Sequence, residues 1–162
     1  MKKIVLVSFL LSAFGWLSAQ NTSYWQQHVD YKMEVSMDVK TYQYKGKQEL
    51  VYTNNSPETL TRVFYHLYPN AFSPGSEMDA RIQSIKDPDA RMVHKATVNG
   101  GETKQSRIKD LKPNEIGFLH IANFKQDGVA ASAKEVGTIL EVTLAKPLLP
   151  GAKTIFTLDF EG

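Results

Sequence analysis

The residues of this chain that could bind a metal ion are chiefly its four histidines, since it contains no cysteine. They are His28, His66, His94 and His120, and the closest two stand 26 residues apart. Zinc enzymes commonly begin their ligand set with a short spacing such as H-E-x-x-H, which places two imidazoles on one helix face. That spacing is absent, so the sequence predicts no metal ligand and no cofactor-binding residue. Because His66 lies in an apolar run, we expect it to be a hydrogen-bonded core residue.

Carboxylates two residues apart occur twice in one polar segment, each pair close to an arginine. The pairs are Glu77 with Asp79 near Arg81, and Asp87 with Asp89 near Arg91. Such oxygens in a loop could bind calcium, or serve a hydrolase as acid and base. We favour a solvated loop with local salt bridges, because exposed charges usually have that role.

Other catalytic signatures are missing. The chain has no G-x-S-x-G motif, and Gly100-Gly101 lacks the spacing and the following helix of a phosphate-binding loop. The sequence therefore predicts no catalytic residue. A hydrolase that uses the loop carboxylates remains the weakest hypothesis, because no nucleophile, base or metal cluster supports it.

The first 19 residues have the three regions of a secretory signal peptide. Lys2 and Lys3 are followed by a mostly apolar run over residues 4–17, and Ser18-Ala19 offers a small-residue cleavage site. The run is short for a membrane span, and a buried N-terminal element is the alternative. We expect export to the periplasm or the medium, with no membrane span after signal removal. Without cysteines, packing rather than disulfides must stabilise the exported chain.

Charge excludes one class of partner. Of 19 basic and 17 acidic residues, Lys2 and Lys3 belong to the signal, which leaves the mature chain formally neutral. No basic block remains, so nothing supports nucleic-acid binding. The remaining length, about 143 residues, is that of one domain able to bury a core.

The clearest structural signal is alternation over residues 31–39, YKMEVSMDV. Apolar residues such as Met33 and Val35 alternate with polar residues such as Glu34 and Ser36, which predicts a half-buried strand. On that interpretation Val35→Asp should unfold the chain by burying a charge, whereas Ser36→Asp should be tolerated.

Further strands are expected along the rest of the chain, with one long interruption. Residues 62–68 are apolar on both faces, which predicts a central strand covered on both sides. The polar residues 70–115 predict a long loop with a short helix near 78–86. The other expected strands are 47–53, 116–121, 138–144 and 154–160, the last two joined by a hairpin-like connection at 147–151. Together these features predict an all-β fold, an antiparallel, saddle-like β-sandwich.

Aromatic residues recur through the first half of the mature chain. We expect them to serve core and interdomain packing, although an aromatic ligand-binding face is the alternative. They are Tyr24, Trp25, Tyr42, Tyr44, Tyr52, Phe64, Tyr65, Tyr68 and Phe72.

Three segments resemble the N-terminal domain of the aminopeptidase N family of zinc metallopeptidases, in particular its exported bacterial members. They read YWQQHVDYKMEVSMDV, KQELVYTNNSPETLTRVFYHLYPNAF and GTILEVTLAKPLLPGAKTIFTLDFEG. The resemblance covers residues 24–162 and implies a saddle-like β-sandwich beside a thermolysin-like catalytic domain. In that family, zinc is held by H-E-x-x-H with a downstream glutamate, and a G-x-M-E-N loop grips the substrate amine. None of these motifs is present here, so no catalytic residue is assigned.

The resemblance implies a noncatalytic domain, residues 20–162, of a larger exported enzyme that hydrolyses peptides from their N-terminus. Its partners would be the catalytic domain of the same polypeptide and, through it, the peptide substrate, with zinc in that other domain. We expect the domain to be incomplete at its C-terminus and to self-associate when made alone, through the 154–160 edge or an uncovered sheet face. The alternative is a stand-alone secreted β-sandwich that binds a protein or a carbohydrate.

Overall fold

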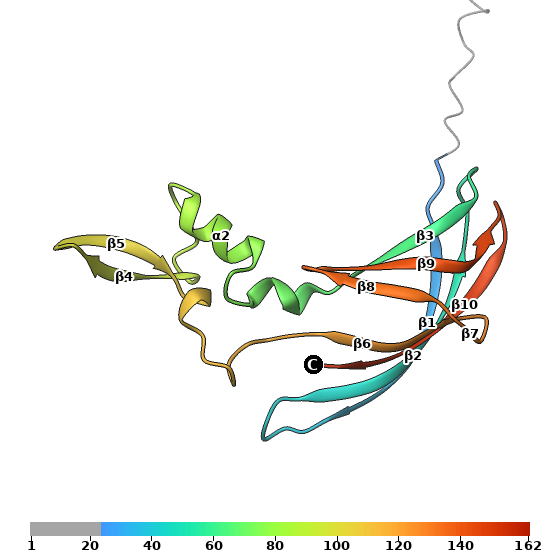
Figure 1. Cartoon of the computed structure of the whole chain (residues 1–162), viewed down its shortest axis with the longest axis horizontal. Helices are drawn as coiled ribbons and strands as arrows, with labels where there is room; N and C mark the ends of the chain where they lie inside the picture. The colour runs from blue at the N-terminus through green and yellow to red at the C-terminus, as the bar shows by residue number, and fades with distance from the viewer. Residues whose placement is uncertain (1–23) are drawn as a thin grey trace, which may run out of the picture.

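The computed structural model describes residues 24–162, so the predicted signal peptide lies outside the described residues. The described part is an antiparallel, all-β, sandwich-like fold, which confirms the predicted fold class (Figure 1). No helix within residues 24–162 is long and apolar enough to cross a membrane.

Two sheets make up the sandwich. The large sheet has the strand order β1-β2-β10-β6-β7, and the small sheet has the order β3-β9-β8. The strands of the large sheet are β1 (His28–Met37), β2 (Tyr44–Thr53), β10 (Lys153–Glu161), β6 (His120–Gln126) and β7 (Val129–Ala130). Those of the small sheet are β3 (Leu60–His66), β9 (Ile139–Leu148) and β8 (Ser132–Val136). The sheets lie close together near the β9–β10 connection and diverge toward the β1–β2 turn (Figure 1).

The segment 70–115, predicted as a long loop, contains regular structure. It begins within η1 (Tyr68–Phe72) and holds α2 (Glu77–Ser84), η2 (Ile108–Asp110) and a hairpin of β4 (Val93–Val98) with β5 (Gly101–Ser106). The short helix was predicted, whereas the hairpin strands were not. Asn99 and Gly100 both have positive φ angles, 52° and 81°, as the two central residues of a tight hairpin turn require.

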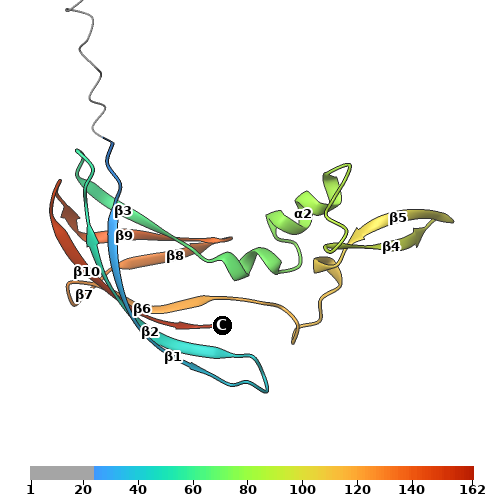
Figure 2. The same cartoon turned by 180° about the vertical axis from the view of Figure 1, so that it is seen from behind.

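This excursion lies apart from the two sheets (Figure 2). It has its own small hydrophobic cluster, formed by Ile82, Val93 and Ile108, with Met92 and Leu111 at its border. Its strands are too polar to give a clear alternation, which is why the sequence pattern did not reveal them.

The main core lies between the sheets, where the inner faces of both meet. We call the side of the large sheet that carries Leu50 and Phe156 its inner face. Phe156 is 1% exposed, and its ring centroid lies 5.4 Å from Phe124 and 6.0 Å from Tyr52. The small sheet contributes Leu140 and Val142 from its central strand.

Residues 62–68 do not form the doubly covered central strand that we predicted. β3 is an edge strand that pairs only with β9, and Val63 is its one buried residue. Phe64 on its outer face is 56% exposed. His66, predicted as a core residue, is also exposed and stacks on Tyr68 with ring centroids 5.0 Å apart. An apolar run cannot by itself distinguish two covered faces from one.

The connection over residues 147–151 is a crossover rather than a hairpin. β9 belongs to the small sheet and β10 to the large one, so the two strands do not pair. β10 instead pairs with β2 on one side and β6 on the other. The predicted open edge at residues 154–160 is therefore wrong. The predicted strand at 116–121 is shifted as well, since β6 begins at His120.

β1 has the predicted alternation but not the predicted burial. Tyr31 and Met33 lie on the inner face, with Tyr31 opposite Leu50 in β2, while Lys32 and Glu34 lie on the outer face. Even so, Val35 is 60% exposed, and Tyr31, Met33 and Met37 are more than half exposed as well. Only Val29, at the start of the strand, packs against the core. The small sheet does not reach across this part of the large sheet.

The exposure of Val35 changes the expected effect of Val35→Asp. The aspartate would stay in solvent, so we expect the free energy of unfolding to change by about 1 kcal/mol or less, the range of strand propensities. Urea unfolding of the isolated chain should place Val35→Asp close to Ser36→Asp. Unfolding by Val35→Asp alone would show that this face is covered in solution.

Candidate functional site

The four histidines are not brought together. Three of them pair with different carboxylates: His28 with Asp30 at 3.2 Å, His94 with Asp110 at 3.4 Å, and His120 with Glu135 at 2.8 Å. His66 stacks on a tyrosine instead. Among residues 24–162, no group of three histidine, aspartate or glutamate side chains is placed to hold a metal ion.

The loop carboxylates lie in two different environments. Asp89 and Arg91 form an exposed salt bridge at 2.6 Å, and the hydrogen bonds from Arg91 lower the pKa of Asp89 to about 2. Asp87 pairs with Lys104 at 3.2 Å. The pair of Asp89 with Arg91 is a local salt bridge of the kind expected from the sequence, whereas Asp87 pairs with a lysine 17 residues further along the chain.

Asp79 is the exception, because it is buried and anchors the start of α2. Its carboxylate accepts from the Gly75 amide and the Gln83 side chain, both at 2.9 Å. Ser76, the residue before the helix, accepts from the Asp79 amide at 3.2 Å and so caps the first turn of α2. Burial by itself raises the pKa of Asp79, but hydrogen bonds from Ser106, Gly75 and Gln83 together lower it. Asp79 therefore stabilises the start of α2.

The lowered pKa of Asp79 predicts a pH-dependent stability. Its contribution is fully present above the ordinary value of 3.8 and is lost as the pH falls through the lower folded-state pKa. Asp79→Asn should therefore destabilise the chain by about 1–3 kcal/mol at pH 7, and by less at pH 2. Thermal unfolding of both proteins at the two pH values measures the difference. An equal loss at both would assign the effect to packing alone.

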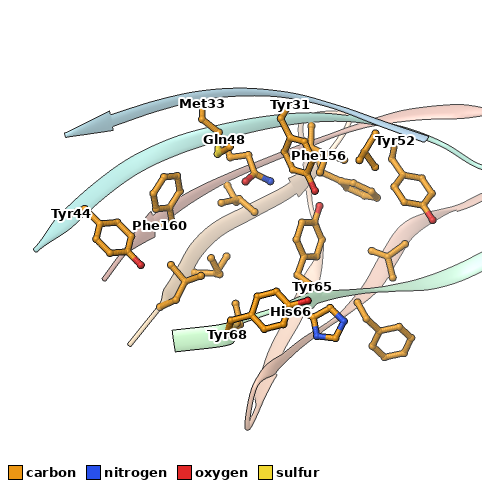
Figure 3. Close-up of a pocket in the computed structure, with 18 residues that line it drawn as sticks. Tyr31, Met33, Tyr44, Gln48, Tyr52, Tyr65, His66, Tyr68, Phe156 and Phe160 are labelled. Atoms are coloured by element: carbon orange, nitrogen blue, oxygen red, sulfur yellow. The ribbon is translucent and has the colours of Figure 1, made fainter. Parts of the chain in front are cut away.

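A groove with a mostly apolar lining and a volume of about 530 Å³ lies between the two sheets (Figure 3). β1 and β2 form one wall with Tyr31, Met33 and Tyr44, and β10 contributes Phe160. His66 and Tyr68 lie on the opposite wall, at the end of β3 and the start of η1. The groove is open to solvent where the two sheets diverge, since the inner face of β1 is exposed there.

One buried polar atom in this groove has no hydrogen-bond partner. The Tyr65 hydroxyl is buried without a hydrogen bond and points toward Tyr31 (Figure 3). Burial raises the pKa of Tyr65, and it raises that of Tyr52 as well. Both phenols therefore stay neutral at physiological pH, and Tyr65 offers a hydrogen-bond donor inside an apolar surface.

The residues that line the groove do not form a catalytic arrangement. Its polar groups are phenols, the Gln48 amide and His66, with no carboxylate or serine among the lining residues. No general base paired with a nucleophile lines it. Sequence reasoning identified most of these aromatics but not the groove, because its walls come from strands far apart in the chain.

Comparison of the chain with protein-family models, with curated proteins and with solved structures finds no match.

Proposed function

We propose that this chain is a noncatalytic β-sandwich domain of an exported zinc aminopeptidase, which supports the catalytic domain and the substrate cleft. The observation that carries the proposal is a row of four apolar residues on the inner face of β1, each more than half exposed: Tyr31, Met33, Val35 and Met37. A row of this kind marks a surface that contacts another protein or domain. Interdomain packing is also what the resemblance to aminopeptidase N implies.

The chemistry of the described residues agrees with a supporting role. The histidines are dispersed over four strands and the buried carboxylate, Asp79, is used to cap a helix. Zinc, and the glutamate that would act as general base, belong to the catalytic domain in this proposal.

The first test is to read the gene in frame beyond codon 162. We expect H-E-x-x-H roughly two hundred residues further on, followed by a glutamate, as the resemblance implies. The longer protein should hydrolyse an aminoacyl p-nitroanilide and lose this activity on chelation. The isolated chain should not hydrolyse it, with or without added zinc. A stop codon at position 163, or turnover by the isolated chain, would overturn the proposal.

A matched pair of variants tests the packing. In the longer protein, Val35→Asp should lower the unfolding temperature, because the inner face would then be covered and the charge buried. Ser36→Asp, one residue away on the outer face, should leave that temperature nearly unchanged. If the two variants behave alike in the longer protein, the inner face of β1 is not the interdomain surface.

A second candidate function is ligand binding in the groove by a stand-alone exported protein. The unpartnered hydroxyl of Tyr65 and the surrounding aromatic rings favour it, since rings with a nearby donor suit a sugar or an aromatic peptide side chain. Titration with soluble oligosaccharides and short peptides, with Tyr65→Phe as the control, tests this alternative. Binding that is unaffected by Tyr65→Phe would place the ligand elsewhere.

A further inference from the structure

The outer edge of β1 is the longest open edge of the two main sheets in the described part of the chain. β1 has ten residues, no proline or glycine, and a regular register with β2. The other edges are shorter or irregular: β7 has two residues, β8 has five, and β3 has a register shift between Leu60 and Arg62. A long, regular, open edge offers a row of backbone donors and acceptors to another strand.

The charges on the outer face of β1 alternate in sign. Asp30, Lys32 and Glu34 follow one another at every second position. In an antiparallel pair, residues directly opposite each other have side chains on the same face, and unlike charges there are favourable. An alternating row can therefore face a second copy of itself with opposite charges matched, provided that the register is right.

The register centred on Met33 gives favourable side-chain pairs on both faces of the sheet. Lys32 of each copy then lies opposite Glu34 of the other copy, which gives two unlike pairs on the outer face. On the inner face, Tyr31 lies opposite Val35 and Val29 opposite Met37. This register uses residues 29–37, nearly the whole strand.

The neighbouring registers are worse. Centring the pair on Lys32 or on Glu34 places like charges opposite each other. A slip by one residue places the apolar row of one copy beside the polar row of the other. Centring on Tyr31 keeps Asp30 opposite Lys32 but aligns a shorter part of β1. Centring on Val35 aligns a shorter part as well and places Glu34 opposite Ser36, so no unlike charges face each other within the strand.

We propose that two copies of this chain pair through β1, antiparallel and with Met33 at the two-fold axis. The two large sheets then form one continuous sheet, and the exposed apolar rows of the two inner faces become one band. This inference concerns the isolated chain and does not depend on the proposed function. It places on β1 the self-association that the sequence led us to expect at residues 154–160 or at an uncovered sheet face.

Charge-reversal variants test the pairing. Lys32→Glu sets two glutamates opposite each other in both halves of the dimer, and Glu34→Lys sets two lysines opposite each other there. Each variant should raise the dimer Kd by at least about tenfold in sedimentation experiments. Lys153→Glu, an exposed substitution on the central strand β10, is the control and should leave the Kd unchanged.

An equimolar mixture of the two variants is the decisive measurement. Lys32→Glu and Glu34→Lys are complementary, so the mixture should form heterodimers with a Kd close to that of the wild type. Native mass spectrometry with one variant labelled with ¹⁵N detects them. Each substitution also faces a like charge in β2, because Lys32 lies opposite Glu49 and Glu34 opposite Lys47. Mixing the variants cannot relieve that charge repulsion between β1 and β2 of one chain. A restored dimer affinity must therefore come from contacts between chains.

Three results would overturn the inference. They are a wild-type chain that stays monomeric up to its solubility limit, a dimer insensitive to both single variants, and a mixture without heterodimers. The second would place self-association on another surface, such as the groove.

Discussion

Replacing Phe156 with alanine is expected to lower the free energy of unfolding by about 4 kcal/mol. Phe156 is 1% exposed and lies at the centre of the core. Its ring centroid is within 6.4 Å of those of Tyr52, Tyr65 and Phe124. Alanine would leave a cavity between the two sheets and remove three aromatic contacts at once. Urea unfolding followed by tyrosine and tryptophan fluorescence and by circular dichroism measures the loss.

The neighbouring residue provides the matched control. Ile155 belongs to the same strand but is 42% exposed on the outer face of the large sheet. Ile155→Ala should cost about 1 kcal/mol or less, since little buried apolar surface is removed. Similar losses for the two variants would show that the inner and outer faces of β10 have been assigned wrongly.

Replacing Asn54 with alanine is expected to cost about 3 kcal/mol, the second-largest effect. The Asn54 side chain is fully buried where β2 ends. Its amide donates to the carbonyls of Glu58 at 2.7 Å and Leu148 at 3.0 Å. Its oxygen accepts from the Ser56 hydroxyl at 2.6 Å and from Gln27 at 3.2 Å. Alanine would leave several of these groups buried without a partner, which costs more than the hydrogen bonds themselves contribute.

Asn55 is the control for this prediction. It is adjacent in sequence and identical in chemistry, but it is exposed, and its side chain makes one bond, to the Gln26 carbonyl at 2.8 Å. Asn55→Ala should change the free energy of unfolding by about 1 kcal/mol or less. If thermal unfolding gave equal changes for the two asparagines, the role of Asn54 in joining β2 to the end of β9 would be refuted.

Asn54 also illustrates a limit of turn signals. The run Asn54-Asn55-Ser56-Pro57 predicts a turn, and β2 does end just before it. Nothing in that run shows that its first side chain binds Leu148, 94 residues further along the chain. A turn follows from local backbone preferences, which the sequence shows. The hydrogen-bond partners of a buried side chain depend on which distant carbonyl groups the fold brings near it.

The candidate groove also combines features that the sequence shows with features that depend on the tertiary structure. Its aromatic residues could be picked out in the sequence, and their role in packing is confirmed for Tyr52 and Tyr65, which contact Phe156. The unpartnered hydroxyl of Tyr65 could not be predicted, because it depends on the distance between two separate sheets. His66 was misassigned for a related reason, since the sequence of β3 does not show that the strand lies at an edge.

The sequence by itself determined that this is an all-β chain, where β1, β2, β9 and β10 lie, and which residues of β1 share a face. These properties follow from local geometry, because side chains alternate along a strand whatever it packs against. Only the tertiary structure decided which faces are covered, that β9 and β10 belong to different sheets, and that the long open edge is β1. Burial and pairing depend on contacts between residues far apart in the chain, and no local pattern specifies those contacts.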